Sequence, residues 1–128
     1  VHQFEHELSV MYPKIAHGAG LAALWCTWAR YVYKANISRW LQYSANVWNL
    51  DIDYEHPEKT IEEAINLQEQ YYVSLGMPIG LKALGVEEAS LTKLALNCSR
   101  NKTRTLTGYK PLAYDDILAI YQMAYERG

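Results

Sequence analysis

Apolar residues recur three or four positions apart along nearly the whole chain, and glycines and prolines mark the breaks between these segments. The opening segment, residues 1–11, predicts a helix on the spacing of Phe4, Leu8 and Met11. The next segment runs from His17 or Gly18 to about Lys34 and is apolar on nearly all sides. A helix of that kind is typical of the middle of a packed bundle.

The same spacing predicts further helices over residues 38–48, about 57–75, 86–98 and 115–126, with a short helical turn at 81–84. Asn36 is suited to cap one of these helices, and Pro57 to begin another that ends at Gly76. Residues 99–109 are polar and predict a loop. No segment alternates apolar and polar residues as a strand would. The predicted fold class is therefore all-α, with about six helices crossing at steep angles because no heptad pattern is sustained.

Three of the four histidines lie within the first seventeen residues, at His2, His6 and His17. His2 and His6 are four residues apart, so a helix places them on one face. His17 follows a connection that contains Pro13, and two consecutive helices could bring these side chains together. Neutral imidazole is the commonest protein ligand for transition metals, so the cluster indicates part of a metal site. One of the three could instead support a ligand from behind.

Other polar side chains give weaker indications of chemistry. Glu5 and Glu7 lie on the first predicted helix, where glutamates are usually exposed, so we expect neither to act as a base. Asp51 and Asp53 precede His56, but this loop leads into a surface helix, so we expect His56 to be solvated. The chain has no phosphate-binding glycine loop and no dinucleotide motif. Any cofactor dependence must therefore be met by residues outside this chain.

Length and composition narrow the possibilities further. The chain has 128 residues, enough for one domain, and half of them are hydrophobic. A net charge of −2 argues against nucleic-acid partners, and the longest apolar stretch, residues 20–28, is too short to span a membrane. We expect the four tryptophans to lie in the core. We expect Cys26 and Cys98 to be buried free thiols of a cytoplasmic protein.

Several segments of the chain, taken together, are similar to those of one known family: His2-Gln-Phe-Glu-His6-Glu-Leu-Ser, Ile15-Ala16-His17-Gly18, Leu21-Ala22, Leu41-Gln-Tyr-Ser-Ala-Asn-Val-Trp48, Leu75-Gly76-Met77-Pro78, Pro111-Leu112, Asp115-Asp116-Ile117-Leu118 and Ile120-Tyr121. They resemble the helical domain of the iron-containing alcohol dehydrogenases, and most of all the NADPH-dependent butanol dehydrogenases. The resemblance covers essentially the whole chain, and the histidine string is its most specific part.

The resemblance implies a fold and a site. Residues 1–128 would form part of the C-terminal helical half of the dehydroquinate synthase-like fold. His2 and His17 would be ligands of Fe²⁺ or Zn²⁺. His6 would be the catalytic residue and would contact the NAD(P)H cofactor. An N-terminal nucleotide-binding domain, and an aspartate and a histidine four residues apart that complete the metal site, would precede this segment. The implied activity is the interconversion of small alcohols and aldehydes by hydride transfer.

The sequence departs from that family pattern in three respects. It contains no Asp-x-x-x-His pair, and it does not include the cofactor domain. The interval from His6 to His17 is also one residue longer than in some relatives. Val1 also opens the chain inside a predicted helix, so we expect the chain to be a fragment. We expect this fragment to be inactive by itself and to bind metal weakly or not at all. We expect the full-length protein to be a homo-oligomer. Two alternatives stay open. One is a stand-alone helical module that binds a protein, and the other is a fragment of a zinc-dependent enzyme similar to glycerol dehydrogenase or dehydroquinate synthase.

Overall fold

The computed structural model describes residues 1–127, and these residues form six α-helices. The helices are α1 (His2–Met11), α2 (His17–Val32), α3 (Ile37–Trp48), α4 (Pro57–Ser74), α5 (Leu91–Cys98) and α6 (Tyr114–Glu126). Three short 3₁₀ turns join them: η1 (Tyr33–Asn36), η2 (Lys82–Leu84) and η3 (Glu88–Ser90). No strand occurs in this part of the chain, so the predicted all-α fold class is confirmed.

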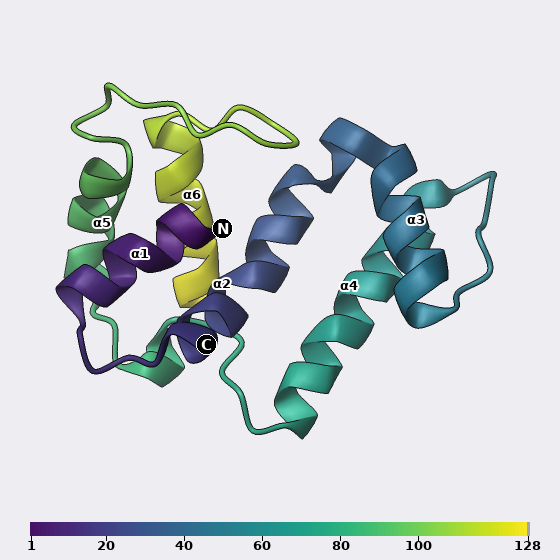
Figure 1. Ribbon diagram of the computed structural model, residues 1–128, viewed down its shortest axis with the longest axis horizontal. Coiled ribbons are helices and arrows are strands. Elements are labelled where there is room, and N and C mark those ends of the chain that lie inside the picture. The colour runs from purple at the N-terminus through teal and green to yellow at the C-terminus, as the bar shows by residue number, and fades with distance from the viewer. Residues whose placement is uncertain (128) are drawn as a thin grey trace.

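Helix α2 is the centre of the molecule. It packs against α1, α4 and α6, while α3 pairs with α4 and α5 pairs with α6. Figure 1 shows the result: α1, α5 and α6 gather on one side of α2, α3 and α4 lie on the other, and α1 lies across α5 and α6. Half of the residues of α2 are buried, which confirms the central position predicted from its apolar character.

Local sequence signals explain most of the helix ends. The Asn36 side chain accepts a hydrogen bond from the Arg39 backbone N–H at 3.1 Å, which caps α3 as predicted. Pro57 is the first residue of α4, where its missing N–H costs nothing. Gly76 adopts a φ of 74° just after α4, and the Met77 N–H bonds back to the Tyr72 carbonyl. A left-handed glycine of this kind is the usual way to end a helix.

The predicted helix over residues 86–98 is shorter in the structure. Val86 is buried and its backbone N–H bonds to the Leu81 carbonyl, and Glu87 is extended, so the chain cannot be helical there. Only η3 and α5 follow. The predicted loop after α5 is confirmed, and it contains an antiparallel bridge between Leu106 and Leu112, both of which are buried.

The core is continuous from α1 to α6. Phe4 and Tyr121 pack against each other, and the Tyr121 hydroxyl donates a buried hydrogen bond to the Phe4 carbonyl at 2.8 Å. Cys26 and Cys98 are buried free thiols, as predicted. Of the tryptophans, only Trp40 is buried. Trp25 and Trp28 are partly exposed and pack against it, and Trp48 is partly exposed and packs on Tyr71, so the prediction of core positions holds fully for Trp40 alone.

A buried carboxylate ties three helices together. Glu69 on α4 is 8% exposed and pairs with Arg30 of α2 at 2.8 Å and with Arg127, which follows α6. Burial opposes ionisation of Glu69, but the two guanidinium groups outweigh it and hold its pKa below the usual value. This link was not predicted from the sequence.

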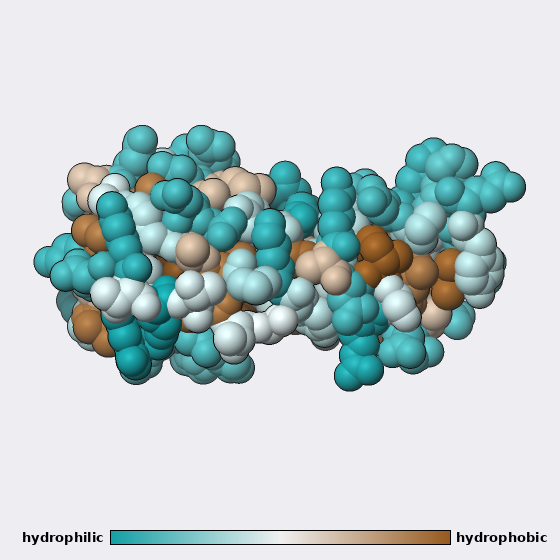
Figure 2. All heavy atoms as spheres, turned by 90° about the horizontal axis from the view of Figure 1, so that it is seen from above, coloured by the Kyte–Doolittle hydropathy of each residue, from teal (hydrophilic) through white to brown (hydrophobic). Residues whose placement is uncertain are grey.

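The surface seen from above is mostly hydrophilic, and hydrophobic atoms appear between the polar side chains rather than as one continuous patch (Figure 2). Within residues 1–127, no helix has the length and apolar character needed to cross a membrane.

Candidate metal centre

His2 and His17 lie side by side at the junction of the first two helices. His2 begins α1 and His17 begins α2. Their ring centroids are 5.7 Å apart and their planes differ by only 12°. The sequence predicted that the two helices could bring these rings together, and the structure does so. Their role as metal ligands stays a prediction.

The connection between the helices is held in place by Tyr12. Its backbone N–H bonds to the Leu8 carbonyl, and its carbonyl accepts from the Ile15 N–H, which turns the chain back on itself. The Tyr12 hydroxyl contacts the Ser90 hydroxyl at 2.8 Å and accepts from the Glu87 N–H at 3.2 Å. This anchor on η3 fixes where α2 begins, and therefore where His17 stands relative to α1.

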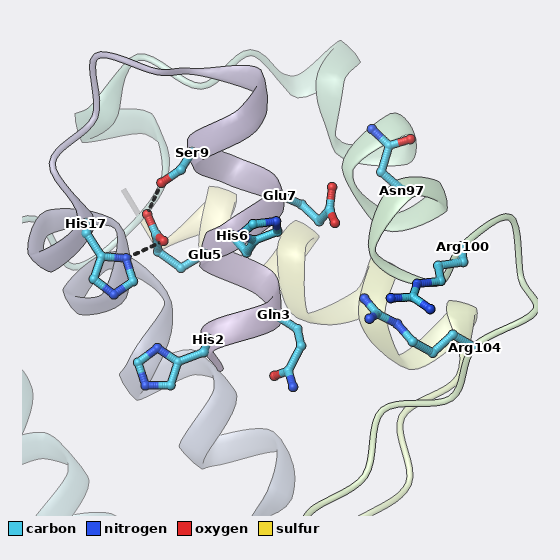
Figure 3. A pocket seen from close by; sticks show the side chains of 10 residues that line it. All are labelled: His2, Gln3, Glu5, His6, Glu7, Ser9, His17, Asn97, Arg100 and Arg104. Carbon is cyan, nitrogen blue, oxygen red and sulfur yellow. Dashed lines mark hydrogen bonds and ion pairs between the residues drawn. The ribbon is translucent and has the colours of Figure 1, made fainter.

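A buried carboxylate stands behind His17. Glu5 is 1% exposed, and its Oε2 lies 2.5 Å from Nδ1 of His17. The Ser9 hydroxyl, one turn along α1, donates to the other carboxylate oxygen. Figure 3 shows Glu5 between Ser9 and His17, and the second ring nitrogen of His17 on the side of His2. An ionised carboxylate only accepts hydrogen bonds, so with Glu5 ionised the donor in this contact is the Nδ1–H of His17.

The expectation that Glu5 is exposed was wrong. Phe4 and Leu8 are fully buried, so they define the inner face of α1. Successive residues of an α-helix are turned by about 100°, which places position 5 beside that face and not within it. The burial of Glu5 was therefore decided by the packing of α2 against α1, where Gly20 lies over its side chain, and neither the burial nor the contact with His17 was contained in the periodicity.

His6 is exposed and lies one turn beyond His2 on the same helix. It lines an open cleft of about 580 Å³ between α1 and the end of α5, together with His2 and His17 (Figure 3). Arg100 and Arg104 form the opposite wall of this cleft. Arg104 is fixed by two hydrogen bonds to the Cys98 carbonyl, at 3.0 and 2.6 Å. Sequence reasoning did not associate these arginines with the histidines, because they come from a distant loop.

The remaining histidine is separate from this cluster. His56 has a side chain that is 56% exposed, and its Nδ1 lies 3.5 Å from Asp53 at the start of α4. The prediction of a solvated role for His56 is confirmed.

The donor set fits half of a metal site. Across residues 1–127, no three His, Cys, Asp or Glu side chains are grouped so that they could hold a metal ion. His2 and His17 offer two imidazole nitrogens. Glu5 is turned toward Nδ1 of His17, so its carboxylate contacts the back of this ring and is not available as a further donor beside it. A complete tetrahedral or octahedral site would need further ligands from outside this segment.

The fold is thus an all-helical domain with a histidine pair and a buried carboxylate at the junction of its first two helices. The model of the Fe-containing alcohol dehydrogenase family, C-terminal domain, matches residues 1–125. The chain therefore belongs to this family, as its resemblance indicated.

Individual relatives agree with the family match. The chain is 34% identical over 125 residues to the NADH-dependent butanol dehydrogenase A of Clostridium acetobutylicum, covering 97% of this chain and 32% of that protein. It is 29% identical over 120 residues to a probable NADH-dependent butanol dehydrogenase of Bacillus subtilis, covering 93% of this chain and 30% of that protein. The chain thus spans about a third of the length of the curated relatives it matches.

Solved structures share the fold. A crystal structure of the NADH-dependent butanol dehydrogenase A from Thermotoga maritima superimposes with a TM-score of 0.85 at 27% identity, covering 97% of this chain and 32% of that one. An aldehyde reductase from E. coli superimposes with a TM-score of 0.83 at 24% identity, covering 96% and 32%. The second likeness shows the fold alone.

Proposed function

We propose that residues 1–128 are part of the C-terminal helical domain of a metal- and NAD(P)(H)-dependent alcohol dehydrogenase that interconverts small alcohols and aldehydes. The observation that carries this proposal is the parallel pair His2 and His17, with a carboxylate behind His17, in a chain that matches the family model over residues 1–125. Relatives named as butanol dehydrogenases support the substrate class. The same relatives favour this activity over that of a stand-alone interaction module.

The proposal divides the site between two parts of a longer protein. In this chain, His2 and His17 hold Fe²⁺ or Zn²⁺, and an aspartate and a histidine of a preceding nucleotide-binding domain complete the site. The bound metal supplies a Lewis acid for the oxygen of the alcohol or aldehyde. The 128 residues alone are expected to be inactive and to bind metal weakly, because two imidazoles leave an ion under-coordinated.

His6 is assigned a proton-transfer or cofactor-contact role. Its exposed ring shares the cleft with His2 and His17, so it can reach both a bound molecule and water. Arg100 and Arg104 line this cleft together with the carboxylate of Glu7, so the side near α5 carries two positive charges and one negative charge (Figure 3). The net positive charge favours anionic parts of a cofactor or substrate. The resemblance in sequence was to NADPH-dependent members, whereas the named relatives are NADH-dependent, so the nicotinamide preference is a prediction to be tested with both cofactors.

The test uses the complete protein that carries this chain, with and without single histidine substitutions. Metal content and the reduction of butyraldehyde are measured with NADH and with NADPH, after loading with Fe²⁺ or with Zn²⁺. His2→Ala and His17→Ala are expected to lose both metal and activity. His6→Ala is expected to keep the metal and lose activity. His56→Ala is the matched control, since His56 lies on the surface with Asp53, and it should change neither.

The results separate the alternatives. Full metal content in both His2→Ala and His17→Ala would refute the proposed site. Activity on glycerol, with Zn²⁺ but not with Fe²⁺, would instead favour the glycerol dehydrogenase-like reading. The homo-oligomer is tested on the same preparations by light scattering.

A further inference from the structure

We infer that Glu5 is the positioning residue of His17, and that Ser9 and Gly20 form the place in which its carboxylate is held. Glu5 holds the His17 ring in the tautomer that carries its proton on Nδ1 of the ring. The lone pair of the other ring nitrogen, Nε2, then lies on the side of His2. The role of this lone pair rests on the proposed function, because a bound metal would use it. The contacts among Glu5, Ser9, His17 and Gly20 do not depend on the metal.

Burial of Glu5 calls for an explanation. A carboxylate that is 1% exposed loses its hydration, and this loss is large unless charged or hydrogen-bonded partners replace the water. An apolar residue at this position would pack between α1 and α2 without that cost. The Ser9 hydroxyl and the His17 ring supply the replacement, one to each carboxylate oxygen. The carboxylate is therefore built into the interface and aimed at His17.

Gly20 provides the space for this arrangement. A Cβ atom added at Gly20 would lie 2.8 Å from both Cγ and Oε1 of Glu5, closer than real side chains approach. Gly20 stands inside α2, where glycine is unfavourable compared with alanine, so the position is occupied at some cost to the helix. By contrast, a Cβ at Gly18, two residues earlier, would meet nothing within 4 Å. The three atoms nearest to a Cβ at position 20 all belong to the Glu5 side chain.

The effect on His17 follows from the chemistry of imidazole. Neutral histidine carries one proton, and the hydrogen bond made by one ring nitrogen decides which nitrogen is free to bind a metal. With Nδ1–H bonded to Glu5, the free nitrogen is Nε2. The His17 side chain is 60% exposed, so without Glu5 the ring would be free to rotate and to exchange tautomers. Metal-binding histidines commonly have such a carboxylate behind them, and its loss lowers metal affinity about 10- to 100-fold.

The first experiment needs no metal. The chain of residues 1–128 is labelled with ¹⁵N-histidine, and the His17 tautomer is determined from the nitrogen shifts and couplings in the wild type and in Glu5→Ala, Glu5→Gln, Ser9→Ala and Gly20→Ala. The wild type is expected to hold its proton on Nδ1. Glu5→Ala and Gly20→Ala are expected to lose that preference, one by removing the carboxylate and the other by displacing it. Gly18→Ala is the matched control and should match the wild type, as should His6 in every variant.

Glu5→Gln keeps the fold testable if the alanine variant unfolds. Its amide has the same shape but one acceptor oxygen where the carboxylate has two, and its NH2 group can donate to Nδ1. The preference for a proton on Nδ1 should therefore weaken in this variant while the packing is kept. An unchanged tautomer in folded Glu5→Ala and in Gly20→Ala would overturn the inference.

The second experiment measures Zn²⁺ affinity of the complete protein by competition with a chelator. Glu5→Ala and Gly20→Ala are expected to weaken binding about 10- to 100-fold. Gly18→Ala and Glu63→Gln, at an exposed glutamate of α4, should leave it unchanged. If His17→Ala loses Zn²⁺ while Glu5→Ala keeps wild-type affinity, only the positioning role of Glu5 is overturned. If His17→Ala also keeps wild-type affinity, the proposed metal site itself fails, whatever the tautomer experiment gives.

Discussion

The close approach of Gly20 to Glu5 predicts that a methyl group added at position 20 lowers the free energy of unfolding of the wild type and raises that of Glu5→Ala. Gly20→Ala in the wild-type chain brings a Cβ to 2.8 Å from the Glu5 side chain, which must move. Moving it breaks the hydrogen bonds to His17 and Ser9. In Glu5→Ala, the same methyl group enters space that the carboxylate has vacated. The sign of the stability change should therefore reverse.

The magnitudes follow from known costs. An alanine in place of a glycine inside a helix stabilises it by about 1 kcal/mol. Separating a buried carboxylate from its partner costs about 3–5 kcal/mol, and the exposed side of His17 lets water reduce this toward the lower figure. Gly20→Ala should thus destabilise the wild type by about 2 kcal/mol, because separating Glu5 from its partner costs about 3 kcal/mol and the alanine in the helix contributes about 1 kcal/mol. In Glu5→Ala it should stabilise by about 1 kcal/mol.

The assay is urea unfolding of the four chains of this cycle, followed by circular dichroism at neutral pH. The coupling free energy between the two positions is expected to be about 3 kcal/mol, well above the error of the method. Gly18→Ala serves as the control and should have the same effect in both backgrounds, since its methyl group meets no neighbouring atom. Equal effects of Gly20→Ala in the two backgrounds would refute the claim that Gly20 is required by Glu5.

Three further predictions concern the helical core. The pKa of Glu69 is lowered in the folded chain, so its ion pairs stabilise the fold at pH values above the unfolded pKa, and this stability is lost as the pH falls through the folded pKa. In a plot of the free energy of unfolding against pH, Glu69→Gln should therefore flatten the acid limb. An unchanged acid limb would contradict this. Tyr121→Phe removes the hydroxyl that bonds the Phe4 carbonyl and should lower the free energy of unfolding by about 1 kcal/mol in urea, whereas no loss would show that the bond contributes nothing. Burial raises the pKa of Cys26 to about 12 and that of Cys98 to about 11. Both thiols should therefore resist a disulfide reagent at pH 8 until urea unfolds the chain. Rapid labelling of the folded protein would contradict their burial.

The sequence by itself determined most of the helices and the histidine pair. The spacing of apolar residues, the Asn36 cap and the glycine after α4 act between residues that are at most four or five positions apart. Such interactions can be recognised without knowing the fold. The histidine string is equally local, and it indicated both the family and the pair that the structure brings together.

The contacts between distant residues were decided only by the tertiary structure. Periodicity places Glu5 beside the inner face of α1, and both its burial and its bond to His17 depend on how Tyr12 anchors the connection and on where α2 crosses α1. The link from Glu69 to two arginines likewise needs three helices in their final positions. A helix fixes which side chains share a face, and packing alone fixes what that face meets. For this reason the histidine pair could be found in the sequence, whereas the carboxylate behind His17 could be assigned only from the structure.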